Sequence, residues 1–182
     1  HYSLRGEISK KIGHALAEAY DKKIFRTIAL AARESHPIEA SPGPEPGGSQ
    51  IQLGVTKEYD AQALVDAFFE AASILDEKNM PKQGRTAVLS PRQYYALVSQ
   101  VSTNILNRDF GNGQGSLNSG EGLYEIAGIQ IRRSNNLPFL AGTVNAETGE
   151  NNAYNGDFSK HCGLIYYKDA AGVVEAIGPQ VQ

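Results

Sequence analysis

The neighbouring residues His161 and Cys162 are the first candidates for chemistry, because an imidazole base can activate a thiol nucleophile. Neighbouring side chains of a strand point to opposite faces, however, so adjacency in the sequence works against a catalytic pair. No third group that would orient the histidine is indicated, and a free cysteine commonly behaves as a small buried hydrophobe. We therefore predict that both residues are structural.

Three glycines at alternate positions, Gly111, Gly113 and Gly115, invite comparison with a dinucleotide-binding loop. Such a loop needs the spacing G-x-G-x-x-G between a strand and a helix, so that the pyrophosphate meets a helix N-terminus. The third spacing is wrong here and no helical pattern follows, so the run predicts a flexible loop. The four histidines lack metal-ligand spacing, and no H-E-x-x-H, C-x-x-C or G-x-S-x-G pattern occurs. The sequence therefore predicts no catalytic residue, no cofactor site and no metal site.

Composition and charge narrow the class of protein. The chain of 182 residues has a net charge of −3, whereas a protein that binds nucleic acid through its phosphates usually has a strong basic excess. Its single cysteine excludes an intrachain disulfide and fits a reducing compartment such as a bacterial cytoplasm. No apolar run is long enough to cross a bilayer, and no polybasic face for a membrane surface is present. These features argue against a nucleic-acid reader and against a membrane protein.

Residues 3–34 have apolar side chains at roughly helical spacing, which predicts one long helix. The apolar positions are Leu4, Ile8, Ile12, Ala15, Leu16, Ala19, Ile24, Ile28 and Ala31. At about 1.5 Å per residue the helix would extend roughly 45–50 Å, which is long for a chain of this size. Gly6 and Gly13 each weaken it by about 1 kcal/mol relative to alanine, so we expect packing within or between subunits to hold it. His36-Pro37 ends the helix, because a residue before proline avoids the helical conformation.

Strand and helix signals alternate in the next part of the chain. Residues 41–49 are rich in Pro and Gly and predict a loop, and the apolar alternation over 51–55 predicts a short strand. A second helix is predicted over 60–78, with Asp60 as its N-cap. A short buried strand over 86–89 follows.

A capping box formed by Ser90 and Gln93, with Pro91 at the first helical position, predicts the start of a third helix. Residues 109–122 contain many Gly, Asn and Ser residues and almost no core-forming side chain. They predict a mobile loop.

The last third of the chain predicts mainly strands. Residues 123–134 indicate two strands joined by a tight turn at Ala127-Gly128, with Ile129 and Ile131 on one face. Residues 142–157 predict a polar loop. A closing hairpin is predicted, with strands over 164–167 and 173–177 and a turn over 169–172. The order of elements indicates an α+β domain preceded by a projecting helix, and such a shape without a catalytic constellation favours assembly over catalysis.

Six polar residues are candidates for contacts with another subunit. They are Lys22, Arg26, Arg132, Arg133, Asn135 and Asn136. The alternative is that the basic helix residues only solvate the helix or form weak salt bridges, and that the remaining four are a polar strand end. Arginine is enriched at protein interfaces, so both interpretations remain open.

Two stretches carry a resemblance to a known family. They are residues 81–97 (PKQGRTAVLSPRQYYAL) and 122–138 (GLYEIAGIQIRRSNNLP). In order and spacing they resemble the major capsid proteins of autographivirus-type podoviruses, including marine cyanophages. Residues 1–30 are similar to the spine-helix region of those proteins, and 164–177 to the strand pair that closes their axial domain.

The resemblance implies the Hong Kong ninety-seven-like capsid fold, an α+β fold in which the sheet of the axial domain is flanked by helices and accompanied by a long spine helix. It implies that residues 1–36 are the spine helix of the peripheral domain, 37–50 a hinge or loop, and 51–182 the axial domain. Residues 111–120 would lie near the centre of a capsomer or at a subunit boundary. We also expect a fragment, because the family's N-terminal arm, extended loop and C-terminal part have no counterpart in the sequence.

The same resemblance implies a structural subunit that assembles into the icosahedral head of a tailed bacteriophage. Its partners would be copies of itself in hexamers and pentamers, together with scaffolding and portal proteins, and it would contain packaged DNA only non-specifically. It would assemble in the cytoplasm of the bacterial host and reside in the virion capsid. Two alternatives stay open: a bacterial nanocompartment shell of the same fold, and a small-molecule-binding or hydrolytic α+β domain.

Overall fold

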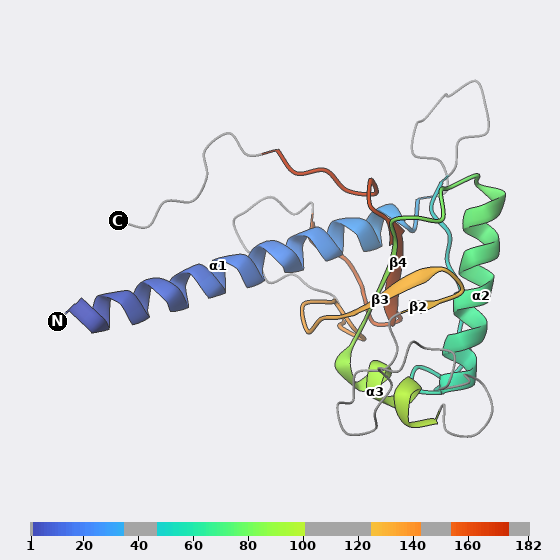
Figure 1. Cartoon of the computed structure of the whole chain (residues 1–182), viewed down its shortest axis with the longest axis horizontal. Helices are drawn as coiled ribbons and strands as arrows, with labels where there is room; N and C mark the ends of the chain where they lie inside the picture. Colours follow the sequence, from blue (N-terminus) through green and yellow to red (C-terminus); the bar gives the residue numbers. More distant parts are fainter. Residues whose placement is uncertain (1, 35–46, 101–124, 143–153, 175–182) are drawn as a thin grey trace.

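The computed structural model describes residues 2–34, 47–100, 125–142 and 154–174. Its elements are α1 (Tyr2–Ala31), α2 (Ala61–Glu77), β1 (Arg85–Leu89), α3 (Pro91–Gln100), β2 (Glu125–Ile126), β3 (Ile129–Arg133) and β4 (Gly163–Tyr167). Figure 1 shows a head of sheet and helices from which α1 projects as a straight rod. This arrangement confirms the predicted α+β class. The loop predicted over 109–122 lies outside the described residues, as does most of the loop predicted over 142–157.

A four-stranded sheet in the order β2-β3-β1-β4 forms the centre of the head. β1 pairs in parallel with β3 and antiparallel with β4, so both of its edges are hydrogen-bonded. Its run Ala87-Val88-Leu89 is fully apolar and buried, as expected for a strand covered on both faces.

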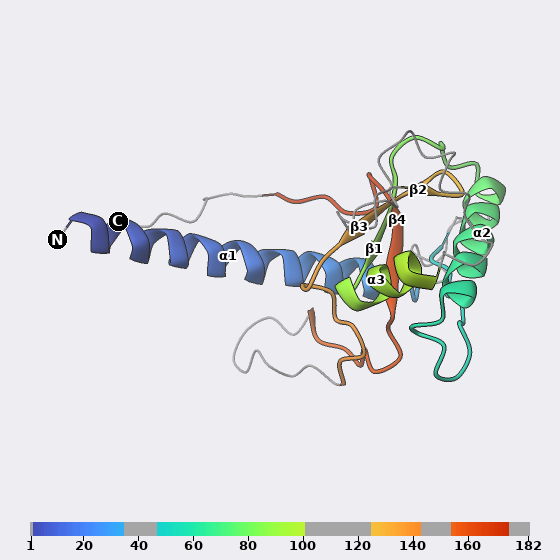
Figure 2. The same ribbon diagram turned by 60° about the horizontal axis from the view of Figure 1, so that its bottom comes forward.

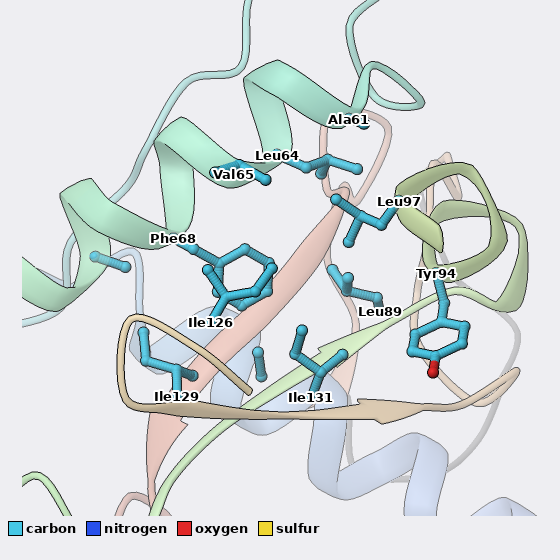
Figure 3. Packing of buried hydrophobic residues seen from close by; sticks show 12 residues of the cluster. Ala61, Leu64, Val65, Phe68, Leu89, Tyr94, Leu97, Ile126, Ile129 and Ile131 are labelled. Carbon is cyan, nitrogen blue, oxygen red and sulfur yellow. The ribbon is translucent and has the colours of Figure 1, made fainter. Parts of the chain in front are cut away.

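The two faces of the sheet are covered by different helices. Ala87 and Leu89 of β1 belong to a core shared with α2, α3, β2 and β3. Figure 3 shows Ile129 and Ile131 pointing from β3 into this core, toward α2. Val88 points to the opposite face and packs in a second, smaller core with Ile28 and Ala29 of α1. The sheet is therefore a middle layer between α2 and α3 on one side and the end of α1 on the other.

Local signals start both helices of the head as the sequence predicts. The Asp60 side chain accepts a hydrogen bond from the backbone N–H of Gln62 at 3.0 Å, which caps α2. At α3 the Ser90 N–H donates to Gln93 Oε1 at 3.1 Å, and the Gln93 N–H donates to Ser90 Oγ at 3.3 Å. The buried Gln93 also donates from Nε2 to the backbone oxygen of Glu58, so the capping box ties α3 to the segment before α2.

The tight turn predicted at Ala127-Gly128 is confirmed. Both residues have positive φ, 51° and 78°, which is the backbone of a two-residue hairpin turn with the right twist for its strands. Ile126 and Ile129 pair directly across it. Glycine at the second position adopts this conformation without the steric cost that a Cβ would add.

Two strand predictions are wrong. Residues 51–55 form no strand: Ile51 and Leu53 pack on the core from a segment that is not paired with the sheet. The partner of β4 is β1 and not the following segment, and the described residues 173 and 174 are not in a strand, whereas 175–177 lie outside the described part. In the first case the apolar alternation predicted the burial of Ile51 and Leu53 but not of Val55, which is 89% exposed. In the second case the hydrogen-bonding partner of β4 was set by the free edge of β1, which is distant in sequence.

Adjacent phenylalanines of α2 provide a test of the core. Phe68 is 2% exposed and Phe69 is 59% exposed. Phe68→Ala is expected to lower the free energy of unfolding by about 3–5 kcal/mol, because it leaves a cavity between α2 and the sheet. Phe69→Ala is the matched control and should change it by less than about 0.5 kcal/mol. Urea denaturation followed by circular dichroism measures the free energy of unfolding of both variants. Equal losses would contradict an orientation of α2 in which Phe68 faces the sheet and Phe69 faces solvent.

Candidate subunit interface

Only the C-terminal end of α1 is packed on the head. Ile28 and Ala29 are buried against β1, β4 and Phe158, whereas residues 4–21 are exposed. Figures 1 and 2 show the remainder of the helix extending away from the sheet in both views. The helix has 30 residues, which corresponds to about 45 Å.

The exposed part of α1 displays a continuous apolar row, which we call the α1 ridge. Its members are Leu4, Ile8, Ile12, Leu16 and Tyr20, with exposed fractions from 64% to 40%. They lie four residues apart, and Ile24 and Ile28 continue the same spacing into the packed part. Rows of this spacing are the ridges by which helices pack into grooves of other helices. Exposed apolar surface of this kind commonly marks a protein–protein contact.

Polar and aromatic contacts clamp the packed end of α1. Asn136 Nδ2 donates to Asp21 Oδ2 at 3.3 Å. The ammonium of Lys23 lies 5.4 Å from the centre of the Tyr154 ring, and the guanidinium of Arg33 lies over the Phe158 ring. These contacts fix the direction in which the ridge leaves the head.

The predicted site residues on α1 are placed near this clamp. Lys22 donates to Glu18 at 2.6 Å within the helix, and this hydrogen bond lowers the pKa of the Glu18 carboxyl. Arg26 lies one turn further along the helix and is half-buried. Asn136 meets the same helix through Asp21, whereas Asn135 is exposed. Lys22, Arg26 and Asn136 are therefore brought to one region.

The neighbouring arginines at the end of β3 point to opposite faces of the sheet. Arg133 follows Ile129 and Ile131 onto the α3 side, and its Nη1 donates to Tyr95 Oη at 3.0 Å. Arg132 lies on the α1 side, where its charge acts on the Tyr166 hydroxyl. Burial raises the pKa of Tyr166, and Arg132 opposes that rise. The six predicted residues therefore do not form one patch.

A second cluster lies at the start of α3, and of its members only Arg133 was a candidate contact residue in the sequence. The Arg133 guanidinium is 4.7 Å from the centre of the Tyr94 ring, and that of Arg92 is 4.0 Å from the centre of the Tyr59 ring. Tyr94 is buried while Tyr95 is 51% exposed, so the two tyrosines divide into one core and one surface residue. The three-residue spacing of Arg92 and Tyr95, which places them side by side on a helix, was the signal that could have revealed this cluster.

His161 and Cys162 have the electrostatics of structural residues. Burial, and then the charge of Arg33, lowers the pKa of His161 to about 4. Burial, and then the charge of Glu58, raises the pKa of the Cys162 thiol. An activated thiolate–imidazolium pair would need both shifts in the opposite direction. The His161 ring instead packs edge-on against Phe158 at a centroid distance of 6.2 Å.

Within the described ranges no group of three or more His, Cys, Asp or Glu side chains could hold a metal ion. No helix of the same ranges has the length and apolar character needed to cross a membrane.

Comparisons with known proteins agree on one family. The family model described as Gp10A-like major capsid protein matches residues 1–182. The capsid structure of cyanophage P-SCSP1u superposes with a TM-score of 0.74 and 36% identity, covering 92% of this chain and 51% of that one. The mature capsid of bacteriophage PhiM1 gives a TM-score of 0.68 and 19% identity, over 90% of this chain and 49% of that one, and shows the fold alone. No match was found among curated protein sequences.

The chain thus spans about half the length of the capsid chains that it matches. These findings confirm the family and the fold that the sequence motifs indicated. They give no support to a nanocompartment shell or to a small-molecule-binding domain.

The buried histidine predicts an acid-sensitive fold. The pKa of His161 is about 4 in the folded chain and 6.5 when unperturbed, so between these values the unfolded chain binds the proton first. The free energy of unfolding should therefore fall as the pH drops from 6.5 to 4, by about 2 kcal/mol once the water-accessible part of the ring is allowed for. Well above pH 6.5 His161 is neutral in both states, so it should not contribute to the pH dependence of the free energy of unfolding.

Urea denaturation at several pH values tests this expectation. Carboxylates also titrate at acid pH, so the contribution of His161 is the difference between the wild type and His161→Gln, which should show a flatter dependence. His14→Gln makes the same exchange on the exposed part of α1 and should retain the wild-type curve. Parallel curves for the wild type and His161→Gln would contradict the prediction.

Proposed function

The chain belongs to the Gp10A-like family of major capsid proteins, and on this premise we propose that it is the shell-building part of a bacteriophage major capsid protein. Copies associate through complementary surfaces into hexamers and pentamers and then into a closed icosahedral head. The family and the fold point to a structural role. The observation that carries the proposal is the α1 ridge, because an apolar row of this length on a projecting helix requires a covering surface.

The proposed domain boundaries agree with how the elements pack. Residues 1–36 act as the spine helix of a peripheral domain, 37–50 as a hinge or loop, and 51–182 as an axial domain. In support of this division, the larger core lies entirely within α2, α3 and the sheet, and α1 contributes only to the smaller one. The spine helix is thus held at one end and is available to other surfaces along the rest of its length.

Association in such a shell is multivalent. Rings form when one surface of a subunit meets a different surface of the next and the rotation closes. Each contact can be weak, because every subunit is held by several neighbours at once and the effective concentration within the lattice is high. We assign subunit contacts to Lys22, Arg26, Arg132, Arg133, Asn135 and Asn136. These residues lie on α1, on both faces of the sheet and in the segment after β3, and they therefore serve more than one neighbour.

Further partners in this proposal are scaffolding and portal proteins during assembly in the bacterial cytoplasm. The net charge of −3 supports containment of DNA in the virion without tight binding to it.

Electron microscopy of the full-length protein, produced together with its scaffolding protein, tests the proposal. We expect closed shells. A full-length protein that remains monomeric under these conditions would overturn it.

The α1 ridge gives a sharper prediction. The double substitution Ile8→Ser/Ile12→Ser removes two apolar side chains that are 49% and 45% exposed. Shell yield should fall at least about tenfold, because each subunit loses about 1–2 kcal/mol of apolar burial per side chain. The fold of the isolated chain should remain intact, since both residues contact solvent there.

The matched control is Lys10→Ser/His14→Ser, which also changes two residues four apart but on the opposite side of the helix. Its shells should form normally. Circular dichroism checks that all variants retain α1, and equal shell yields from both pairs would show that the ridge is not a contact surface.

A further inference from the structure

The outer surface of α2 is acidic. Asp66, Phe69, Glu70, Ser73 and Glu77 are exposed and lie on one side of the helix, and we call them the acidic face. The helix contains no Lys or Arg at all. Among the described residues, Glu70 and Glu77 form no ion pair, and Asp66 accepts a hydrogen bond only from the neutral Gln62. The face also includes an aromatic ring, because Phe69 is 59% exposed.

The outer surface at the start of α3 has the opposite charge. Arg92 and Tyr95 lie side by side on α3, and Arg133 joins them through its hydrogen bond to the Tyr95 hydroxyl. We call these three residues the arginine face. All three are exposed, and Arg92 forms no ion pair within the part of the chain that the structure describes. Arginine and tyrosine, held in position by stacking, are typical of energetically important interface residues.

Each face carries charge of the unfavourable sign for its own helix. Glu77 is the last residue of α2, where the helix dipole disfavours a negative charge. The C-cap Lys78 supplies a positive charge at this end, but its ammonium is bound to the Gly47 backbone oxygen and to Ser49 Oγ and forms no ion pair with Glu77 among the described residues. Arg92 is in the first turn of α3, where the dipole disfavours a positive charge and no acidic residue compensates it. Within the isolated subunit Arg92 has the Tyr59 ring as its partner but no ion pair, and a partner surface of opposite charge would relieve the dipole cost at both helix ends.

The two faces cannot neutralise each other within one subunit. In Figures 1 and 2, α2 lies at the edge of the head farthest from the free end of α1, while α3 begins on the side nearer to α1. Arg92 forms no ion pair with the acidic face within the described ranges.

We propose that the acidic face of one subunit docks on the arginine face of the next copy of this chain. Charge complementarity selects a second copy as the occupant, since one molecule presents both signs on separate surfaces. Because the two faces differ, the contact is heterologous and propagates around a ring. Phe69 and Tyr95 supply aromatic area within the charged contact. This inference rests on the proposed shell function and names the surfaces that join the heads.

Charge reversal tests the contact in the full chain. The acidic-face variant is Glu70→Lys/Glu77→Lys and the arginine-face variant is Arg92→Glu. Each places like charges opposite each other in a ring of identical copies, so the association constant for capsomers should fall at least about tenfold. The melting temperature of each isolated variant should change little. Both substitutions place a favourable charge at a helix end, and for Arg92→Glu this gain is offset by loss of the contact with the Tyr59 ring.

An equimolar mixture of the two charge-reversed variants tests whether the two faces contact each other directly. In a ring where they alternate, a reversed acidic face meets a reversed arginine face, and every native face meets a native one. The equimolar mixture should therefore recover association to within about threefold of the wild type in analytical ultracentrifugation. Lys160→Glu and Asp169→Lys reverse exposed charges outside both faces and should associate normally.

Three results would overturn the inference. The first is normal association of both single-face variants while the wild type forms shells, which would leave the proposed function intact. The second is failure of the mixture to recover. The third is loss of binding to double-stranded DNA by Arg92→Glu with unchanged association, which would assign the arginine face to nucleic acid. Absence of capsomers and shells from the wild type would instead overturn the proposed function, and this contact with it.

Discussion

Burial of β1 between two different helical layers is the constraint on which the other elements depend. Ala87 and Leu89 hold α2 and α3 on one face, while Val88 holds the end of α1 on the other. The strand also begins at a fixed point, because the buried Arg85 bonds to Asp76 of α2 at 2.6 Å and to the backbone oxygens of Met80 and Pro81. Losing one partner of such a buried charge is costly, so the position of α2 relative to β1 is fixed.

The surfaces proposed for assembly derive their positions from this strand. The capping box starts α3 directly after β1, which places Arg92 near the C-terminal ends of β1 and its parallel partner β3. Leu89 pairs with Arg133 in the parallel ladder, so the second arginine lies at the same end of the sheet although it comes from a segment distant in sequence. Val88 anchors the packed end of α1 and so determines where the ridge begins. One buried strand therefore orients both the rod and the charged faces of the head.

The sequence was sufficient to predict those helix starts and turns that are determined by neighbouring residues. Asp60, the Ser90–Gln93 capping box and the Ala127-Gly128 turn each satisfy backbone groups within a few residues, and all three occur as predicted. The partner of β4 depends instead on which edge of the sheet is free, and residues 51–55 depend on a core formed by later segments. No short-range pattern contains that information. The division of Arg132 and Arg133 between the two faces, by contrast, follows from simple alternation along a strand.

The charges of α2 show why a surface is harder to interpret than a core. In the sequence, Asp66, Glu70 and Glu77 have the ordinary pattern of a solvated helix face, and only the structure separates Asp76, which is bonded to Arg85, from the others. A solvated face selected for subunit stability would place basic residues in the last turn of the helix, whereas α2 has none before its C-cap Lys78 and ends on Glu77. Local rules are violated where another requirement outweighs them, and functional sites are the usual place for such violations. In the proposed capsomer contact the outweighing requirement is attraction to the next copy of the chain, and this would account for Glu77 at the end of α2 and Arg92 at the start of α3.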